Sequence, residues 1–509
     1  MVGSKRSRYD GGRVSLFYRC LLAITLIVGL STPAEAQRRS DAPDVPAEAI
    51  EDDARRPRAA ESERSVPDYD NREAAPPTPG QRALWVPRIL LAPVWVISEY
   101  VVRRPLEATV LWAEQSDFSS KVRHALTFGT GGRVGFAPTA LVDFGLRPSA
   151  GLYFWTNGVP TEGDRLRIHL ATGGRNWWRA SVTERISLGD GGANLPFEAS
   201  QLNFRFLFEQ RPDHLFYGLG PQSDPLAGVL EQTQLGGAIG TEFVTGELDG
   251  FAIELSAKRA RYADGAATVD RADGTISQLF PTTPNVSQRS IFGDYRVARL
   301  DVEVTLDSRA ADTSTPGDGV RLEVGAAAGM GGLLDPANRQ FAERTALSAT
   351  EGGRYFRFLQ PRARLGLFWD VNNYRRVLSL TQTIAWSEST GSAPVPAFEL
   401  PAMGGTEAMR SWISGRFRGH STVSTTLQWT YPTFAAIDGF VFAATGQAFG
   451  RRFEGFALGE LQSEFGMGIR SNNDRDAAFE FLVGVGTTPL GDPVKIESVR
   501  MLIGASSGF

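Results

Sequence analysis

Cysteine and histidine are scarce in this chain of 509 residues, which has one cysteine, Cys20, and four histidines. A single cysteine cannot form an internal disulfide, so the fold must rest on backbone pairing and on the burial of side chains. The histidines, His124, His169, His214 and His420, are scattered, and neither a metal-ligand spacing nor a phosphate-binding glycine loop is present. We therefore expect no metal, no cofactor and no catalytic residue.

An uninterrupted apolar run long enough to cross a bilayer as a helix is also missing. A short apolar stretch, residues 21–30, follows a basic N-terminus and precedes Ala34-Glu35-Ala36, which fits a small-residue cleavage pattern. These three parts predict a secretory signal peptide over residues 1–36. The alternative is a membrane anchor, but about eleven apolar residues are too few to span a bilayer.

Excess positive charge is absent as well. Removal of residues 1–36 takes away five basic and two acidic groups from the 53 and 57 of the whole chain, leaving 48 basic against 55 acidic groups and a net charge of −7. This balance has no nucleic-acid footprint, so we expect no nucleic-acid partner.

Residues 37–82 have few large apolar side chains and many Pro, Ala, Arg, Asp and Glu. Such a segment buries too little surface to offset the entropy of ordering, which predicts a disordered linker. Residues 83–120 are apolar and aromatic, but Arg88, Glu99 and Arg103 interrupt them. We expect short amphipathic helices at a membrane interface here. A transmembrane helix is the alternative, which these charges disfavour.

From residue 121 to the end, apolar and polar residues alternate in segment after segment. Leu300, Val302 and Val304, for example, are interleaved with Asp301 and Glu303. The pattern predicts sixteen strands, near 134–144, 149–157, 164–172, 177–188, 199–209, 230–244, 249–262, 294–307, 319–330, 354–369, 374–388, 420–432, 438–449, 456–470, 476–487 and 496–509.

A soluble β-sandwich is the simplest explanation of such alternation, but three features favour a transmembrane barrel. The segments reach about ten residues, the length that a tilted transmembrane strand needs. Their polar faces carry full charges, as a wet lumen permits. The last strand ends on an aromatic residue, Phe509, as a C-terminal barrel signal does. We therefore expect an all-β protein, a 16-stranded antiparallel transmembrane β-barrel over residues 121–509.

Residues 401–432 stand out between the eleventh and twelfth expected strands. A glycine pair, Gly404 and Gly405, precedes the sequence Met409, Arg410, Ser411 and Trp412, and a strand of strict alternation follows. This stretch resembles the signature of the BamA/TamA-type outer-membrane barrel superfamily, also called the bacterial surface antigen family. In that family a surface loop folds back into the barrel and presents a hydrophobic-Arg-Gly-aromatic tip. Two further stretches resemble it, residues 214–221 and 465–470.

The resemblance implies that Gly404, Gly405, Met409, Arg410 and Trp412 form a lumenal loop anchor. Ser411 stands where the family usually has glycine. The family's acceptor for the arginine is an aspartate in a Phe-x-Asp-x-Gly pattern, which here reads 442–446 with Ala444 in the acidic place. The candidate acceptors that remain are Gln428, Glu460, Gln462 and Glu464.

The resemblance implies a protein of the insertase/translocase superfamily in the bacterial outer membrane, active in outer-membrane assembly or in transport across that membrane. Its expected partners are outer-membrane lipids, with nascent outer-membrane proteins or lipids as substrates. No periplasmic repeat domain is recognisable. A passive channel, or a structural barrel without insertase activity, is the second hypothesis. An outer-membrane lipase built on His420 and Ser421 is disfavoured, because adjacent strand residues point to opposite faces.

Overall fold

We describe a computed structural model of the full chain, in which two compact units divide at residue 119. The described residues all belong to the second unit: 126–129, 133–143, 147–158, 163–190, 199–221, 227–244, 249–265, 272–279, 293–309, 317–334, 355–371, 375–391, 393–434, 437–471 and 477–507. The expected signal peptide, linker and amphipathic helices, and the terminal Phe509, lie outside these residues.

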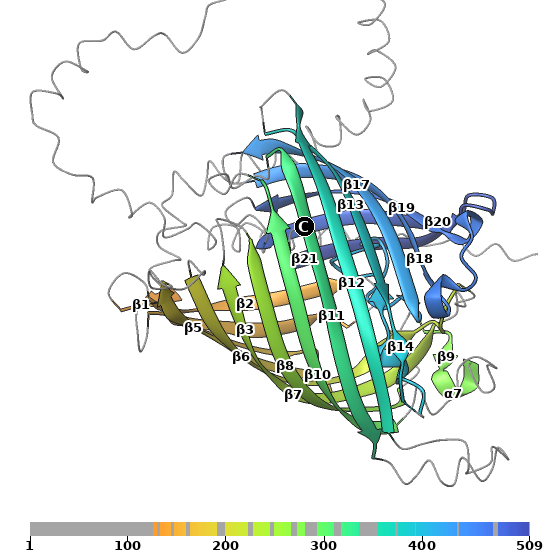
Figure 1. Ribbon diagram of the computed structural model, residues 1–509, viewed down its shortest axis with the longest axis horizontal. Coiled ribbons are helices and arrows are strands. Elements are labelled where there is room, and N and C mark those ends of the chain that lie inside the picture. The colour runs from red at the N-terminus through yellow and green to blue at the C-terminus, as the bar shows by residue number, and fades with distance from the viewer. Residues whose placement is uncertain are drawn as a thin grey trace, which may run out of the picture. The chain divides into compact units, whose positions relative to one another are not determined.

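Sixteen strands of eight residues or more make up the described sheet, which confirms the expected all-β antiparallel architecture (Figure 1). They are β2 (Val134–Asp143), β3 (Ser149–Asn157), β4 (Arg165–Thr172), β5 (Trp178–Asp190), β6 (Ala199–Phe216), β7 (Gly228–Val244), β8 (Gly250–Asp264), β10 (Gly293–Asp307), β11 (Gly319–Leu333), β12 (Tyr355–Asp370), β13 (Val377–Trp386), β17 (Ser421–Phe434), β18 (Ile437–Phe449), β19 (Gln462–Ser471), β20 (Ala477–Pro489) and β21 (Ile496–Ser507).

Short elements complete the described chain: β1 (Thr127–Phe128), β9 (Gly274–Thr275), α7 (Ile276–Leu279), β14 (Glu388–Ser389), η5 (Ala397–Glu399), β15 (Ala402–Met403), β16 (Phe417–Arg418), η6 (Arg451–Phe453) and η7 (Leu458–Glu460). Among the described residues, no helix has the length and hydrophobicity needed to span a bilayer.

The long strands pair antiparallel with their neighbours in chain order, and β21 returns to pair with β2. The sheet is therefore a closed barrel. Its seam is short: only Val142↔Ile503 and Asp143↔Leu502 are paired between β2 and β21 among the described residues. By comparison, eight residue pairs join β2 to β3, and thirteen join β10 to β11.

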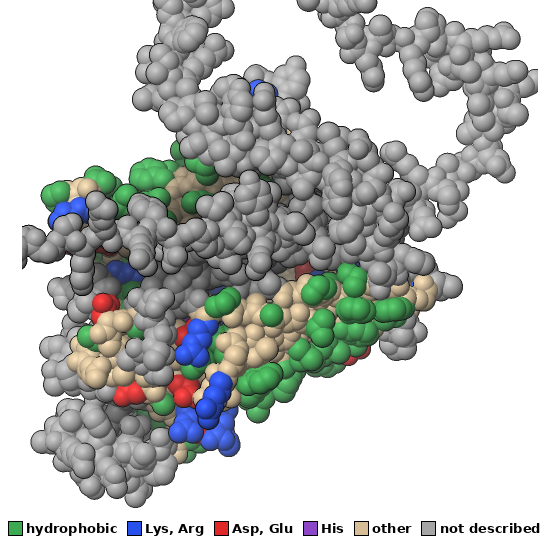
Figure 2. All heavy atoms as spheres, turned by 180° about the vertical axis from the view of Figure 1, so that it is seen from behind, with side chains coloured by type: hydrophobic (Ala, Val, Ile, Leu, Met, Phe, Trp, Pro, Cys, Tyr) green, Lys and Arg blue, Asp and Glu red, His purple; other side chains and the backbone are tan. Residues whose placement is uncertain are grey.

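Strand parity gives the outer face mostly apolar side chains and places ion pairs such as Arg362–Glu303 on the lumenal face. On β12, the outward row runs from Tyr355 to Trp369, which are 73% and 61% exposed, with Leu359, Leu365 and Leu367 exposed between them. An apolar band bounded by aromatic residues is what a bilayer core and its two interfaces require. Hydrophobic side chains are spread along the strands in the space-filling view (Figure 2).

This parity predicts a large difference between two arginine substitutions on β10. Leu300, in the middle of the strand, is 43% exposed on the outer face. Leu300→Arg should lower the free energy of unfolding in lipid by about 2–4 kcal/mol, because a guanidinium would enter the hydrocarbon. Thr305→Arg is the matched control: its side chain has lumenal parity and pairs across from Glu323. Denaturant titration of both variants in vesicles measures the difference, and equal costs would contradict the parity.

Two expected strand boundaries differ from the structure by more than three residues. β6 continues past residue 209 to Phe216, because a bulge between Arg211 and His214 carries the strand beyond Pro212. The stretch 214–221 therefore begins inside a strand rather than after it. The strand expected from residue 456 begins at Gln462. The preceding residues form η7, with the Glu460 N–H donating to the carbonyl of Ala457.

Candidate functional site

The long connection between β13 and β17 folds back on itself and is largely buried. Within it, β15 and β16 pair as a hairpin. Gly404 and Gly405 follow β15 directly, and their φ angles of 101° and 104° favour glycine. Their N–H groups donate to the carbonyls of Ala408 and Trp412 at 3.0 and 2.9 Å. Met409 has a φ of 53° and is fully buried, so a strained backbone is held by packing. We call residues 404–412 the loop tip.

Arg410 places its guanidinium against the barrel wall. Nη2 donates to Oε1 of Gln428 at 2.6 Å, and Nη1 lies 3.5 Å from a carboxylate oxygen of Glu480. The same group lies over the rings of Phe442 and Phe440, 4.2 and 5.1 Å from their centroids. Of the four candidate acceptors, Gln428 is thus the one that accepts a hydrogen bond from the guanidinium. Glu480, on β20, was missed by the sequence analysis.

The side chain of Glu464 bonds to backbone N–H groups of the loop tip and not to the guanidinium of Arg410. Its carboxylate accepts the N–H groups of Arg410 at 2.9 Å and Ser411 at 2.7 Å, and the residue is 1% exposed. Two successive N–H groups point the same way because the tip turns sharply, with the Trp412 N–H bonded to the carbonyl of Met409. Such a concave pair of amides is a ready anion site, which here binds a wall carboxylate.

The other two candidate acceptors do not bond to Arg410 in the described part of the chain. Glu460 lies in η7 and is exposed, and its carbonyl accepts from the Gln447 side chain. Gln462 is buried at the start of β19, where its Oε1 has no hydrogen-bond partner among the described atoms. Glu460 precedes the first residue of β19 by two positions, so it does not lie on the strand that carries Gln462 and Glu464.

The last strand, β21, also bonds to the loop tip. Arg500 donates from Nη1 to the carbonyls of Gly405 at 2.5 Å and Arg410 at 2.8 Å. Ser498 donates from Oγ to the carbonyl of Ser411 at 2.8 Å. Strand parity could have shown that Ser498 and Arg500 share a face. The partner of each could not be found from the sequence, because the bonds join segments about ninety residues apart.

Glycines on the wall leave room for the tip. A Cβ on Gly484 would lie 2.2 Å from the hydroxyl of Ser411, and one on Gly486 would lie 2.3 Å from the ring of Trp412. Both glycines are on β20 and bring no side chain into the lumen. The serine at the position where the resembled family has glycine is therefore accommodated by a glycine opposite it.

The second half of the connection contacts the opposite part of the barrel. Arg416 stacks on Tyr217 at 4.7 Å, and Ile413 packs with Leu215 and Val229 in one apolar cluster. The N–H of Gly220 donates to the carbonyl of Arg418 at 2.8 Å. Residues 214–221, which the sequence analysis singled out by resemblance, thus form part of the surface on which the connection rests.

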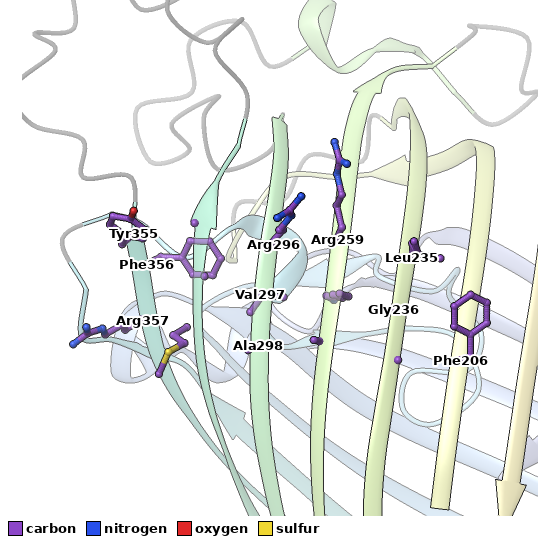
Figure 3. Close-up of a pocket in the computed structure, with 16 residues that line it drawn as sticks. Phe206, Leu235, Gly236, Arg259, Arg296, Val297, Ala298, Tyr355, Phe356 and Arg357 are labelled. Atoms are coloured by element: carbon purple, nitrogen blue, oxygen red, sulfur yellow. The ribbon is translucent and has the colours of Figure 1, made fainter.

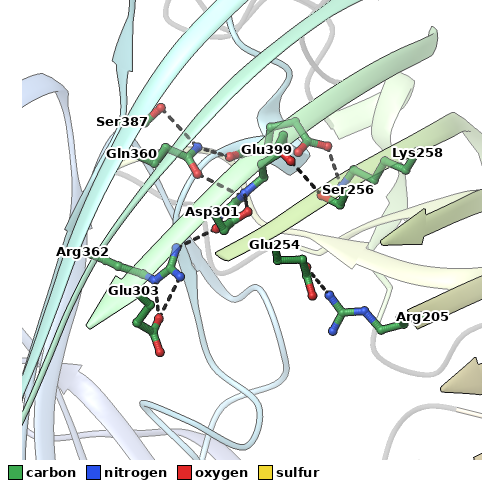
Figure 4. A network of polar contacts seen from close by, with 11 residues as sticks. Arg205, Glu254, Ser256, Lys258, Asp301, Glu303, Gln360, Arg362, Ser387 and Glu399 are labelled. Carbon is green, nitrogen blue, oxygen red and sulfur yellow. Dashed lines mark hydrogen bonds and ion pairs between the residues drawn. The ribbon is translucent and has the colours of Figure 1, made fainter. Parts of the chain in front are cut away.

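A polar network holds the start of the connection (Figure 4). Glu399 accepts from the hydroxyl of Tyr295 at 2.6 Å and lies 2.7 Å from Nζ of Lys258. Gln360 donates to the Glu399 carbonyl. Beside it is a cavity of 860 Å³, lined by opposed charges. The ion pairs along it are Arg205–Glu254, Arg299–Asp301, Arg362–Asp301 and Arg362–Glu303.

The described part of the lumen contains hydrogen bonds and packed side chains that hold the connection in place. No cluster of three His, Cys, Asp or Glu side chains that could hold a metal occurs among the described residues. The hydroxyl of Ser421 is buried and accepts from the N–H of Phe453 at 3.1 Å. The arrangement can hold a loop across the lumen and attach it to both sides of the wall.

An antiparallel barrel with an apolar outer surface and a connection folded into its lumen defines the class of this protein. A scan against protein-family models matches none, and a search of curated proteins finds no similar sequence.

Among solved structures, the chain is similar to BamA from Haemophilus ducreyi lacking POTRA domains 1-3, with a TM-score of 0.46 and 11% identity over 73% of this chain and 70% of that one. CdiB from Acinetobacter baumannii gives 0.43 and 10%, covering 73% of this chain and 59% of that one. CdiB from Escherichia coli gives 0.43 and 9%, covering 73% and 62%. The matches thus span less than two thirds of the CdiB chains, and the likeness is one of fold.

Proposed function

We propose that this protein resides in the bacterial outer membrane, exported by a cleaved signal peptide, and assists the insertion of outer-membrane proteins or lipids by opening between β2 and β21. The observation that carries this proposal is the seam. Among the residues that the structure describes, two pairs join β2 to β21, whereas eleven join β20 to β21.

Opening of the seam would expose backbone groups on both strands. Among the described residues, the pairs Val142↔Ile503 and Asp143↔Leu502 would have to separate. In a bilayer, an unpaired N–H or C=O costs several kcal/mol, since no water is present to bond to it. An exposed strand edge also templates the pairing of an incoming strand. A substrate strand that adds to β21 would therefore satisfy these groups.

The loop tip connects to this seam directly. Ser498 and Arg500 lie on β21, shortly before the seam residues Leu502 and Ile503, and both donate to tip carbonyls. On the lumenal side, the loop tip thus links the last strand, β21, to Glu464 on β19. Release of the tip would free β21, which couples the lumenal connection to the opening of the seam.

Cross-linking tests the proposal. In a chain lacking Cys20, Val142→Cys and Ile503→Cys would place a thiol on each strand of a seam pair. We expect oxidation to lower the outer-membrane protein content of a deletion strain that carries this variant, and reduction to restore it. The matched control is Val302→Cys with Ala326→Cys, which locks β10 to β11. Full activity with the seam oxidised would exclude lateral opening.

A passive channel is the second candidate, favoured by the charged cavity of 860 Å³ in the lumen. A channel would conduct with the seam locked, because ions pass along the axis rather than through the wall. Steady conductance in planar bilayers, together with a normal outer-membrane composition after deletion of the protein, would favour the channel over the insertase.

A further inference from the structure

A groove on the outer surface of the barrel crosses β6, β7, β8, β10, β11 and β12 near one end (Figure 3). Its volume is 690 Å³. We call it the outer groove. Its outward positions form two cross-strand rows, of which one runs Leu235, Arg259, Arg296, Gly332, Tyr355 and the other Phe206, Gly237, Ala257, Ala298, Met330, Arg357.

Side-chain size explains why the surface is hollow there. The middle of the second row consists of Gly237, Ala257 and Ala298, which stand between the larger side chains of Phe206 and Met330. Phe206 is 46% exposed and Met330 62% exposed, so both rise from the sheet as walls. The floor is therefore apolar and shallow, with the dimensions of a site for hydrocarbon chains rather than for a polar solute.

Positive charge gathers at the same place. Arg259 and Arg296 are direct neighbours on β8 and β10, and Figure 3 shows them side by side. Arg357 is exposed at the end of the second row, and Arg261 is exposed one row further along β8. Among the described residues at these ends of β8, β10 and β12, one outward carboxylate stands against the four guanidinium groups: Asp294, which is bonded to Arg259. The two rows themselves contain no acidic residue.

Electrostatics makes the excess of positive charge in this cluster costly unless a further anion is bound beside Asp294. Like charges directly opposite on neighbouring strands destabilise a sheet. An arginine on the lipid face of a barrel is also unfavourable, except near the interface, where headgroup phosphates are within reach. Tyr355, in the same row as the two arginines, is the kind of aromatic residue that marks that interface. A phosphate group would bond to the guanidinium forks in a bidentate way.

The position of the outer groove identifies the leaflet. β12 is the tenth long strand, so its first residues lie at the end of the barrel opposite to the start of β2. At this end β14, the start of the folded-in connection, pairs with β12 at Phe358 and Leu359. If both chain ends of the barrel lie on the periplasmic side, as in outer-membrane barrels generally, the outer groove faces the outer leaflet.

We propose that the outer groove binds the lipid A part of lipopolysaccharide, with acyl chains over Gly237, Ala257 and Ala298 and phosphate on Arg296, Arg357 and Arg259. This site is separate from the seam and from the loop tip. It would fix the barrel to the outer leaflet on the side away from the proposed opening.

Native mass spectrometry of the full chain in detergent, titrated with lipid A, tests this site. We expect Arg296→Gln combined with Arg357→Gln to weaken lipid A binding at least about tenfold, because charge-assisted bonds to phosphate are lost. Ala298→Trp should weaken it as well, by filling the floor without a change of charge. The matched control is Arg205→Gln, which removes a guanidinium from the lumenal face.

The lipids used as probes separate the possible sources of phosphate. Dephosphorylated lipid A should bind the wild-type chain as weakly as lipid A binds the double variant. Inorganic phosphate should not compete at equal concentration. Equal binding of phosphatidylglycerol and lipid A would overturn the proposal, as would unchanged binding by both the double variant and Ala298→Trp. Heat-dependent gel mobility shows that each variant is folded before it is titrated.

Discussion

Glu464→Ala should release the loop tip and lower the heat resistance of the folded barrel. The carboxylate accepts two N–H groups in a site that is 1% exposed, so both amides would remain buried without partners. Hydrogen bonds to a charged group contribute about 1.5–3 kcal/mol each. The expected loss is therefore about 3–6 kcal/mol from the contacts of the tip. Semi-native gel mobility after heating measures it.

Two comparisons make the Glu464 result specific. Glu464→Gln keeps one acceptor oxygen and should lose about half as much. Glu460→Ala removes a carboxylate four residues away that is exposed and outside the strand, and should leave the melting temperature unchanged. A Glu464→Ala barrel that melts like the wild type would show that the tip is held by other contacts.

Gly486→Val should displace Trp412 from the wall and open the lumen. A Cβ at this glycine would lie 2.3 Å from the indole ring, closer than real Cβ contacts allow, and Trp412 is 3% exposed in a packed cluster. Overpacking of this kind costs about 1–3 kcal/mol. The loop tip would avoid this cost only by moving away from the barrel wall. We expect larger single-channel conductance in planar bilayers and a red shift in Trp fluorescence.

Gly237→Val is the matched control for that experiment. Gly237 is also a strand glycine, but it faces outward, and the nearest atom to its Cβ would be the carbonyl oxygen of Arg205 at 3.4 Å. The single-channel conductance of the Gly237→Val barrel should equal that of the wild type. Equal conductance of Gly486→Val and Gly237→Val would mean that the tip does not restrict the lumen.

The contacts of Arg410 show which parts of the site could be predicted from the sequence. Gln428, on the strand directly after the connection, was among the candidate acceptors that the family resemblance supplied. Glu480 was missed, since it lies seventy residues further along the chain and nothing local marks it. Glu464 was expected to meet the guanidinium and instead accepts backbone N–H groups. That difference depends on the turn at Met409, whose left-handed conformation no propensity would predict.

The strands themselves were largely determined by local pattern. Alternation with a period of two assigns the faces of β10 and β12 within each strand, because successive side chains point to opposite sides of a sheet. The approximate number of strands and the place of the long connection follow from the same pattern and from turn residues. Each of these features depends on residues close together in the chain.

Tertiary structure alone decided how those strands and that connection meet. The seam between β2 and β21 joins the first and last strands of the barrel, and the bonds from Arg500 and Ser498 to the loop tip join segments about ninety residues apart. The outer groove likewise needs six strands in a particular register to bring Arg259, Arg296 and Arg357 beside a floor of small residues. Register is set by the sum of many cross-strand contacts, so no single stretch of sequence contains it.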